Sequence, residues 1–285
     1  MANVFEAPQL EVVASTDDFH YVVRDPATGA RLAEVRPVLV GEGHREEKGR
    51  FKRFLRALPG MGTVIDDHHV PRVICEVSDA TGSPIFLVDR ADKVIGHPCT
   101  PYSAVVAPDG AVVGYLTTEH EKVLRPPTDG PVDPDGTTQV GGRAHVRNES
   151  FEVLLDIVMR MDLKGKRSSA DDYAGIDTSR LVGGDGTIWA RMIAHGPVLH
   201  CAPQAPGRLK ILLLAHLISR ELDERLHMSF VLNSYVSPDP LVPTRDPYPG
   251  WRDVHSTYMR YQEEFIEQYK KYKQEIRRRA GAGAS

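Results

Sequence analysis

Residues 208–219 read Arg-Leu-Lys-Ile-Leu-Leu-Leu-Ala-His-Leu-Ile-Ser, and this stretch decides which fold to expect. Pro206 and Gly207 precede it, and the charged run Arg-Glu-Leu-Asp-Glu-Arg follows at 220–225. A helix over 209–226 would be apolar on nearly every side of its first turns, so other elements must enclose it. Its most apolar part, 209–218, is ten residues long, whereas a membrane span needs about 20. The stretch therefore predicts a core helix rather than a membrane anchor.

The sequence before this helix repeats one local pattern, in which a turn containing Asp and Gly is followed by an apolar run. Such turns supply the positive φ that tight hairpins require. The residues beside the turns alternate in polarity or are β-branched, as is typical of strands. The four turns lie at residues 25–29, 79–82, 108–110 and 184–186. The pattern predicts a succession of antiparallel hairpins.

Two stretches between the hairpins and the helix have contrasting compositions. Residues 151–163 alternate almost strictly between apolar and polar side chains, which favours a long strand with one buried face. A helix is the rival there, because Leu and Met are good helix formers. Residues 125–147 are rich in Pro, Gly, Asp and Thr, and they predict a long loop.

The C-terminal part changes character twice. Residues 233–250 are rich in Pro and predict an extended linker. Over 251–285 we expect a long amphipathic helix, because aromatic and apolar residues recur every three or four positions along one side. A seam so rich in Tyr suits a protein partner or self-association, and packing back on the rest of the chain is an equal alternative. The predicted contact residues are Trp251, Tyr258, Tyr261, Phe265, Tyr269 and Tyr272.

Composition narrows the function classes. A length of 285 residues suits one large β domain with extensions or two small domains. The net charge of −4 gives no global drive toward nucleic acid. Three widely spaced cysteines without a CxxC predict neither a disulfide framework nor a zinc site, and no cofactor is expected. Residues 1–17 lack the pattern of a signal peptide, so we expect a cytoplasmic protein, with a peripheral position at the membrane as the alternative.

The hairpins and the late apolar helix together resemble the tubby-like fold, and most of all its phospholipid scramblase and LURP-one-related branch. The resemblance covers roughly residues 15–230, and the helix at 209–222 takes the place of the family's central helix. It is carried by Tyr-Val-Val-Arg-Asp-Pro-Ala-Thr-Gly-Ala-Arg-Leu-Ala-Glu-Val at 21–35, Cys-Glu-Val-Ser-Asp-Ala-Thr-Gly-Ser-Pro-Ile-Phe-Leu-Val-Asp-Arg at 75–90, Ser-Ala-Val-Val-Ala-Pro-Asp-Gly-Ala-Val-Val-Gly-Tyr-Leu at 103–116 and Asp-Gly-Thr-Ile-Trp-Ala-Arg-Met-Ile at 185–193.

The resemblance implies a β-rich (α+β) fold, a closed antiparallel β-barrel around a central hydrophobic helix, to which the residue pattern adds a long C-terminal amphipathic helix. The expected organisation is a barrel over 1–232 with its helix at about 208–226, a linker over 233–250 and the last helix over 251–285. It also implies association with lipids or phosphoinositides. The chain lacks the Cys-rich cluster and the Pro-rich N-terminal region of the scramblases and ends in a charged helix, which counts against lipid translocation.

Several clusters of polar residues invite a chemical interpretation, but each has a simpler one. Adjacent side chains seldom converge on one metal ion, an EF-hand requires a Glu where the chain has Ala144, and a phosphate-cradling loop opens a helix rather than a strand. The sequence therefore predicts solvated loops and a hairpin turn at these places. The clusters are Asp66-Asp67-His68-His69, Asp133-Pro-Asp-Gly136 and Gly183-Gly-Asp-Gly186.

Three histidines and a cysteine complete the chemical candidates. His195, His200 and Cys201 lack a nucleophile elbow, so a hydrolase is the least favoured function. His216 lies in the apolar helix and is expected to be a buried histidine that needs a partner.

The basic residues of segment 45–56 are interleaved with Phe51, Phe54 and Leu55, which suits an anionic membrane surface or a phosphoinositide headgroup. The alternative is a solvated stretch with its Phe residues in the core. We therefore expect a noncatalytic binding or scaffold protein of the scramblase and LURP-one-related class, and the alternative is a peripheral, scramblase-like lipid-handling protein. The predicted anionic-lipid contacts are Lys48, Arg50, Lys52, Arg53 and Arg56.

Overall fold

The computed structural model shows a β-rich fold with one long helix, α2, among the residues that it describes. It describes residues 4–15, 19–42, 44–45, 68–94, 99–119, 137–139, 143–162, 177–193, 198–227, 239–256 and 260. The strands are β1 Gln9–Ala14, β2 Tyr21–Arg24, β3 Arg31–Val40, β4 His44–Arg45, β5 His68–Val70, β6 Val73–Asp79, β7 Pro84–Arg90, β8 Lys93–Val94, β9 Cys99–Val106, β10 Val112–Glu119, β11 Thr137–Gln139, β12 Arg143–Arg147, β13 Val153–Asp162, β14 Asp177–Gly183, β15 Ile188–Ile193 and β16 Val198–Cys201.

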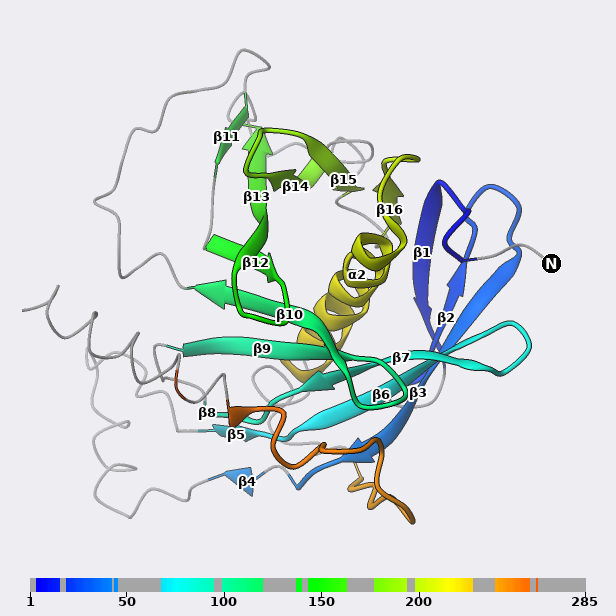
Figure 1. Cartoon of the computed structure of the whole chain (residues 1–285), viewed down its shortest axis with the longest axis vertical. Coiled ribbons are helices and arrows are strands. Elements are labelled where there is room, and N and C mark those ends of the chain that lie inside the picture. Colours follow the sequence, from blue (N-terminus) through cyan, green and yellow to red (C-terminus); the bar gives the residue numbers. More distant parts are fainter. Residues whose placement is uncertain are drawn as a thin grey trace, which may run out of the picture.

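Twelve strands of the described residues form a closed antiparallel barrel (Figure 1). Around the ring the order is β13-β12-β10-β9-β7-β6-β3-β2-β1-β16-β15-β14, and pairing of β14 with β13 closes it. Strand β11 extends the sheet beside β13, and β4, β5 and β8 form a small separate sheet. The prediction of a β-rich antiparallel barrel is confirmed.

The hairpin turns predicted from the Asp and Gly pattern are present. Gly29, Gly82, Gly110 and Gly186 all have positive φ, which an L-residue adopts only with strain. Gly110 has a second reason to be glycine, because a Cβ there would lie 2.4 Å from the carbonyl oxygen of Pro249. The β9–β10 turn is therefore shaped to accept the C-terminal segment.

The strand predicted over 151–163 is confirmed as β13, and the rival helix is excluded. Leu155 and Ile157 are buried on its inner face, whereas Leu154 is 37% exposed. Val153, which belongs to the same apolar set, is 47% exposed at the start of the strand, so the alternation indicated the strand and, at residues 155 and 157, its inward side.

The predicted loop over 125–147 is wrong in its C-terminal half, because β11 occupies Thr137–Gln139 and β12 occupies Arg143–Arg147. Strand β12 pairs with β10 on one side and β13 on the other. Ala144 and Val146 are buried, and the barrel cannot close without a strand at this place. Pairing with two neighbours overrides the loop-like composition of the residues before it.

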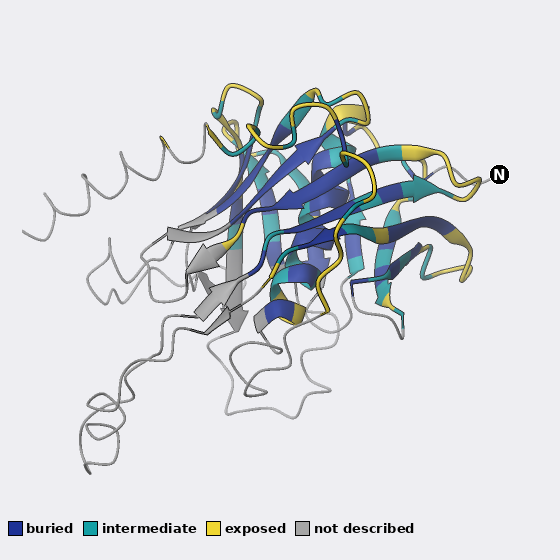
Figure 2. Cartoon of the chain, turned by 90° about the horizontal axis from the view of Figure 1, so that it is seen from below, coloured by how far each residue is buried: buried dark blue, intermediate teal, exposed yellow. Residues whose placement is uncertain are grey.

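Helix α2 covers Gly207–His227, as the apolar stretch predicted. Leu212, Leu213, Leu214 and Ala215 are each 0% exposed. Because consecutive residues point about 100° apart around a helix, these four are buried on all of its sides. The helix contacts β1 and β16 as well as β7, β9 and β10, and Figure 2 shows it among buried strand residues. Within the described part of the chain, none of the helices is long and apolar enough to cross a membrane.

Residues 239–256 lie along the barrel. Val40 and Leu241 exchange two backbone hydrogen bonds of 2.9 and 3.0 Å, so this segment adds an antiparallel bridge to the end of β3. Tyr248 is 2% exposed and packs in a second hydrophobic cluster with residues of β7, β9 and β10. The Pro-rich segment is thus fixed to the barrel over the residues that the structure describes, and most of the predicted helix over 251–285 lies outside them.

Candidate functional site

A buried carboxylate on β7, Asp89, gathers donors from distant parts of the chain. Arg72 donates from Nε at 2.9 Å and from Nη2 at 2.5 Å. Tyr248 donates its hydroxyl to the same carboxylate, and His255 Nε2 lies 3.0 Å from Asp89 Oδ1. The Asp89 cluster, defined as Asp89, Arg72, Tyr248 and His255, therefore joins the barrel wall to the C-terminal segment.

The electrostatics of the Asp89 cluster favour an ionised carboxylate. Burial acts to raise the pKa of Asp89, but hydrogen bonds and charge from Arg72 and His255 hold it below its usual value. Burial and the negative charge of Asp89 raise the pKa of Tyr248, so its hydroxyl keeps its proton and donates it in the hydrogen bond. The Asp89 carboxylate therefore has three partners within the cluster, whereas Nδ1 of His255, which is also buried, has no hydrogen-bond partner.

The same cluster positions Trp251. Arg72 donates from Nη2 to the Trp251 carbonyl oxygen at 2.6 Å, and its guanidinium lies 5.0 Å from the centre of the indole ring. Arg252 lies 5.2 Å from that ring, and the indole Nε1 donates to Asp246 at 2.9 Å. Such cation–π contacts hold the ring in one orientation.

Trp251 lines a groove of about 380 Å³ between the end of β3 and the C-terminal segment. On its rim Val242 is 81% exposed and Leu241 is 40% exposed. An aliphatic pair beside an indole is the type of anchor that protein interfaces use. We call this feature the Trp251 groove; its lining consists of Leu39, Val40, Gly41, Glu42, Trp251, Arg252 and residues 240–246.

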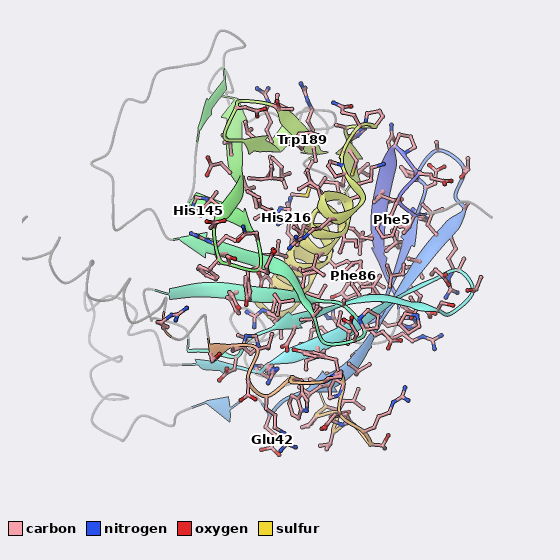
Figure 3. The ribbon with its side chains drawn as sticks, in the orientation of Figure 1. Phe5, Glu42, Phe86, His145, Trp189 and His216 are labelled. Carbon is pink, nitrogen blue, oxygen red and sulfur yellow. The ribbon has the colours of Figure 1, made fainter. Side chains whose placement is uncertain are left out.

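The charge around the Trp251 groove is balanced. Glu42 and Asp246 contribute carboxylates, and Arg245 and Arg252 contribute guanidinium groups; all four side chains are exposed. Figure 3 shows Glu42 beside the C-terminal segment. A balanced rim lacks the excess of cations by which a surface attracts anionic lipid.

Of the residues predicted to contact lipid or a protein partner, the structure describes only Trp251. Trp251 is half-buried at the groove, as described above. The other predicted partner contacts, Tyr258, Tyr261, Phe265, Tyr269 and Tyr272, lie outside the described residues, as do the predicted lipid contacts Lys48, Arg50, Lys52, Arg53 and Arg56. Both sets remain predictions.

His200 and Cys201 do not form a nucleophile and base. They are consecutive residues of β16, where the burial pattern alternates, so their side chains point to opposite faces. Burial raises the pKa of the Cys201 thiol to about 11, which keeps it protonated and unreactive at neutral pH. Among the residues that the structure describes, no three His, Cys, Asp or Glu side chains are grouped to hold a metal ion.

Sequence reasoning missed the Asp89 cluster. Its members are separated by up to 183 positions, from residue 72 to residue 255, and no local motif connects them. One signal was present: Asp89 and Arg90 interrupt the apolar run of β7, where every residue from 86 to 90 is buried. A charged pair on such a strand requires buried partners, but the sequence does not say which residues supply them.

Comparison with known proteins gives no relative for this chain: no protein-family model, no curated protein and no solved structure matches it. The geometry described above is therefore the basis for a functional proposal.

Proposed function

We propose that this protein is a noncatalytic binding or scaffold protein with the architecture of the scramblase and LURP-one-related class, in which α2 is the central helix of the barrel. Two observations support that architecture. Twelve strands close into an antiparallel ring, and the turn of α2 at residues 212–215 is fully buried, while the helix contacts β1 and β16 as well as β7, β9 and β10.

The observation that carries the binding role is the Trp251 groove. It combines exposed aliphatic side chains, an indole held between two guanidinium groups and a rim of balanced charge. The Asp89 cluster holds the C-terminal segment 239–256 against the barrel wall. The groove is therefore preformed, and a partner that binds there does not have to order the C-terminal segment. We propose a protein partner here, with the aromatic residues of 258–272 as an extension of the same contact.

The second proposed contact is with anionic lipid or phosphoinositide headgroups, through Lys48, Arg50, Lys52, Arg53 and Arg56. The protein is then cytoplasmic and peripheral at the membrane, and the alternative function is scramblase-like lipid handling. A hydrolase is disfavoured, because Cys201 is buried and His200 points to the other face of β16.

Liposome flotation of the full chain tests the lipid contact. Vesicles of phosphatidylcholine alone are compared with vesicles that contain phosphatidylserine or a phosphoinositide. We expect salt-sensitive binding to the anionic vesicles only, with most of it lost in a Lys52/Arg53/Arg56→Ala variant, because each basic residue near an anionic surface contributes about 1 kcal/mol.

A matched control removes three positive charges elsewhere. Arg36, Arg191 and Arg225 are exposed residues of the described structure, and their triple Ala variant should float like the unmodified chain. Equal losses in the two variants would show a nonspecific effect of net charge, and absence of binding at low salt would reject the lipid contact and leave the protein partner as the function.

A further inference from the structure

A cavity of about 180 Å³ lies inside the barrel, between one side of α2 and the wall formed by β10, β12, β13, β14 and β15. Helix α2 has its closest contacts with β1, β7, β9, β10 and β16, so its packing leaves room opposite β12–β15. The strands contribute an apolar lining from Leu116, Ala144, Ile157 and Met192. The space is thus an amphipathic pocket with one apolar wall.

The helix side of this cavity carries a histidine without a partner. His216 lines the cavity, and its Nε2 atom is buried and has no hydrogen-bond partner. Figure 3 shows His216 on the side of α2 that faces β12 and β13. Burial and the nearby charge of Arg220 lower the pKa of His216 to about 4, so the ring is neutral at pH 7. A buried ring nitrogen left unpaired is costly and points to a group that the cavity receives.

Arg220 lies one helical turn after His216 and lines the same cavity. Side chains four positions apart share one face of a helix. Arg220 is half-buried, and no described residue forms a hydrogen bond or an ion pair with it, whereas other arginines of the barrel have such partners. The cavity therefore has an unpaired ring nitrogen and a guanidinium group on the same side of α2.

The remaining polar groups near the cavity are already satisfied. Asp223 is paired with the buried Arg90 at 2.5 Å, and Ser219 shares a hydrogen bond of 2.7 Å with Ser103. Asp223 and Arg90 form an ion pair, and Glu221, which interacts electrostatically with Arg220, does not line the cavity. Arg220 therefore presents a positive charge to the cavity without an ion pair to any described lining residue. Such an arrangement suits a ligand with a single negative charge.

We propose that this cavity binds a small organic carboxylate, a monoanion whose apolar body is about the size of a benzene ring. The carboxylate lies at Arg220 and accepts a hydrogen bond from His216 Nε2, and the body packs on Leu116, Ile157 and Met192. A cavity of about 150 Å³ accommodates benzene, which sets the size. A dianion such as phosphate would leave one charge uncompensated against an apolar wall.

This inference does not rest on the proposed lipid or protein contacts, and it stands if both of those fail. The cavity is formed by α2 and the strands β10, β12, β13, β14 and β15, whereas the Trp251 groove lies between the end of β3 and the C-terminal segment.

The test is a titration of the full chain with 4-fluorobenzoate, observed by fluorine NMR, with the neutral 4-fluorobenzamide as the matched ligand. We expect the benzoate to bind about tenfold more tightly than the amide, because a hydrogen bond to a charged group is stronger than one between neutral groups. Arg220→Gln should abolish the preference for the acid, and His216→Leu should weaken the binding of the benzoate.

Arg225→Gln is the matched control, since Arg225 is exposed on α2 and does not line the cavity; it should leave both affinities unchanged. Ala144→Leu, which fills the cavity, should reduce binding of both ligands. Thermal melting confirms that each variant is folded. Equal affinity for acid and amide, an unchanged preference in Arg220→Gln, or no binding of either ligand would overturn the proposal.

Discussion

The Asp89 cluster and the His216 cavity both contain buried polar groups, and they differ in how the charged group in each is paired. In the Asp89 cluster the carboxylate receives Arg72, Tyr248 and His255, so its charge is matched. In the cavity His216 Nε2 has no partner and Arg220 makes no ion pair with a described residue. The Asp89 cluster holds the C-terminal segment in place, whereas His216 and Arg220 in the cavity are available to bind the proposed carboxylate.

The comparison predicts a large loss of stability when the Asp89 cluster is unbalanced. Asp89→Asn should lower the free energy of unfolding by about 3–5 kcal/mol, because Arg72 is left buried beside a neutral amide. Urea denaturation measures the change. Asp253→Asn, at an exposed carboxylate of the same segment, should stay within about 0.5 kcal/mol of the unmodified chain. Equal changes in the free energy of unfolding for the two substitutions would mean that the Asp89 cluster stabilises the fold no more than an exposed carboxylate does.

The cavity predicts a dependence on pH. Unfolded histidine has a pKa near 6.5, and that of folded His216 is about 4, so between these values the unfolded chain binds the extra proton. The free energy of unfolding should therefore fall as the pH falls from about 7 to 4, by up to about 3 kcal/mol from this residue. His216→Leu should remove that part of the fall, as seen by urea denaturation at a series of pH values. Arg225→Gln should retain it; a fall of the same size in His216→Leu would contradict the prediction.

A smaller effect is expected from the tyrosine of the Asp89 cluster. Tyr248→Phe removes one hydrogen bond to a charged group, so the free energy of unfolding should fall by about 1.5–3 kcal/mol. A double-mutant cycle with Asp89→Asn should show coupling of at least about 1 kcal/mol, since both side chains act through one contact. Strict additivity of the two changes would indicate that the hydroxyl does not interact with the carboxylate.

The smallest effect is expected at the rim of the Trp251 groove. Val242 is 81% exposed, so Val242→Ser should change the free energy of unfolding by less than about 0.5 kcal/mol. If the partner is a second copy of this chain, sedimentation velocity should show weaker association in the variant. A large loss of stability would mean that Val242 supports the fold rather than a contact.

The two regions also show what sequence patterns reveal. Turn glycines and the apolar stretch 209–218 predicted the hairpins and α2, because both depend on neighbours in the sequence. Strand β12 was missed, since its place is set by pairing with β10 and β13 rather than by composition. The partners of Asp89 were missed for the same reason: closure of the barrel brings Arg72 and His255 together. The sequence predicted that His216 would need a partner. It did not predict the cavity beside His216, because the position of α2 within the barrel determines where space is left.

Diffraction from crystals of the full chain soaked with 4-bromobenzoate is the most direct test of the claim that His216 and Arg220 mark a binding site. We predict an anomalous bromine peak between α2 and strands β12–β15, with the carboxylate within hydrogen-bond distance of Arg220 and His216. A cavity that stays free of the ligand, or a bromine peak confined to the Trp251 groove, would contradict the account.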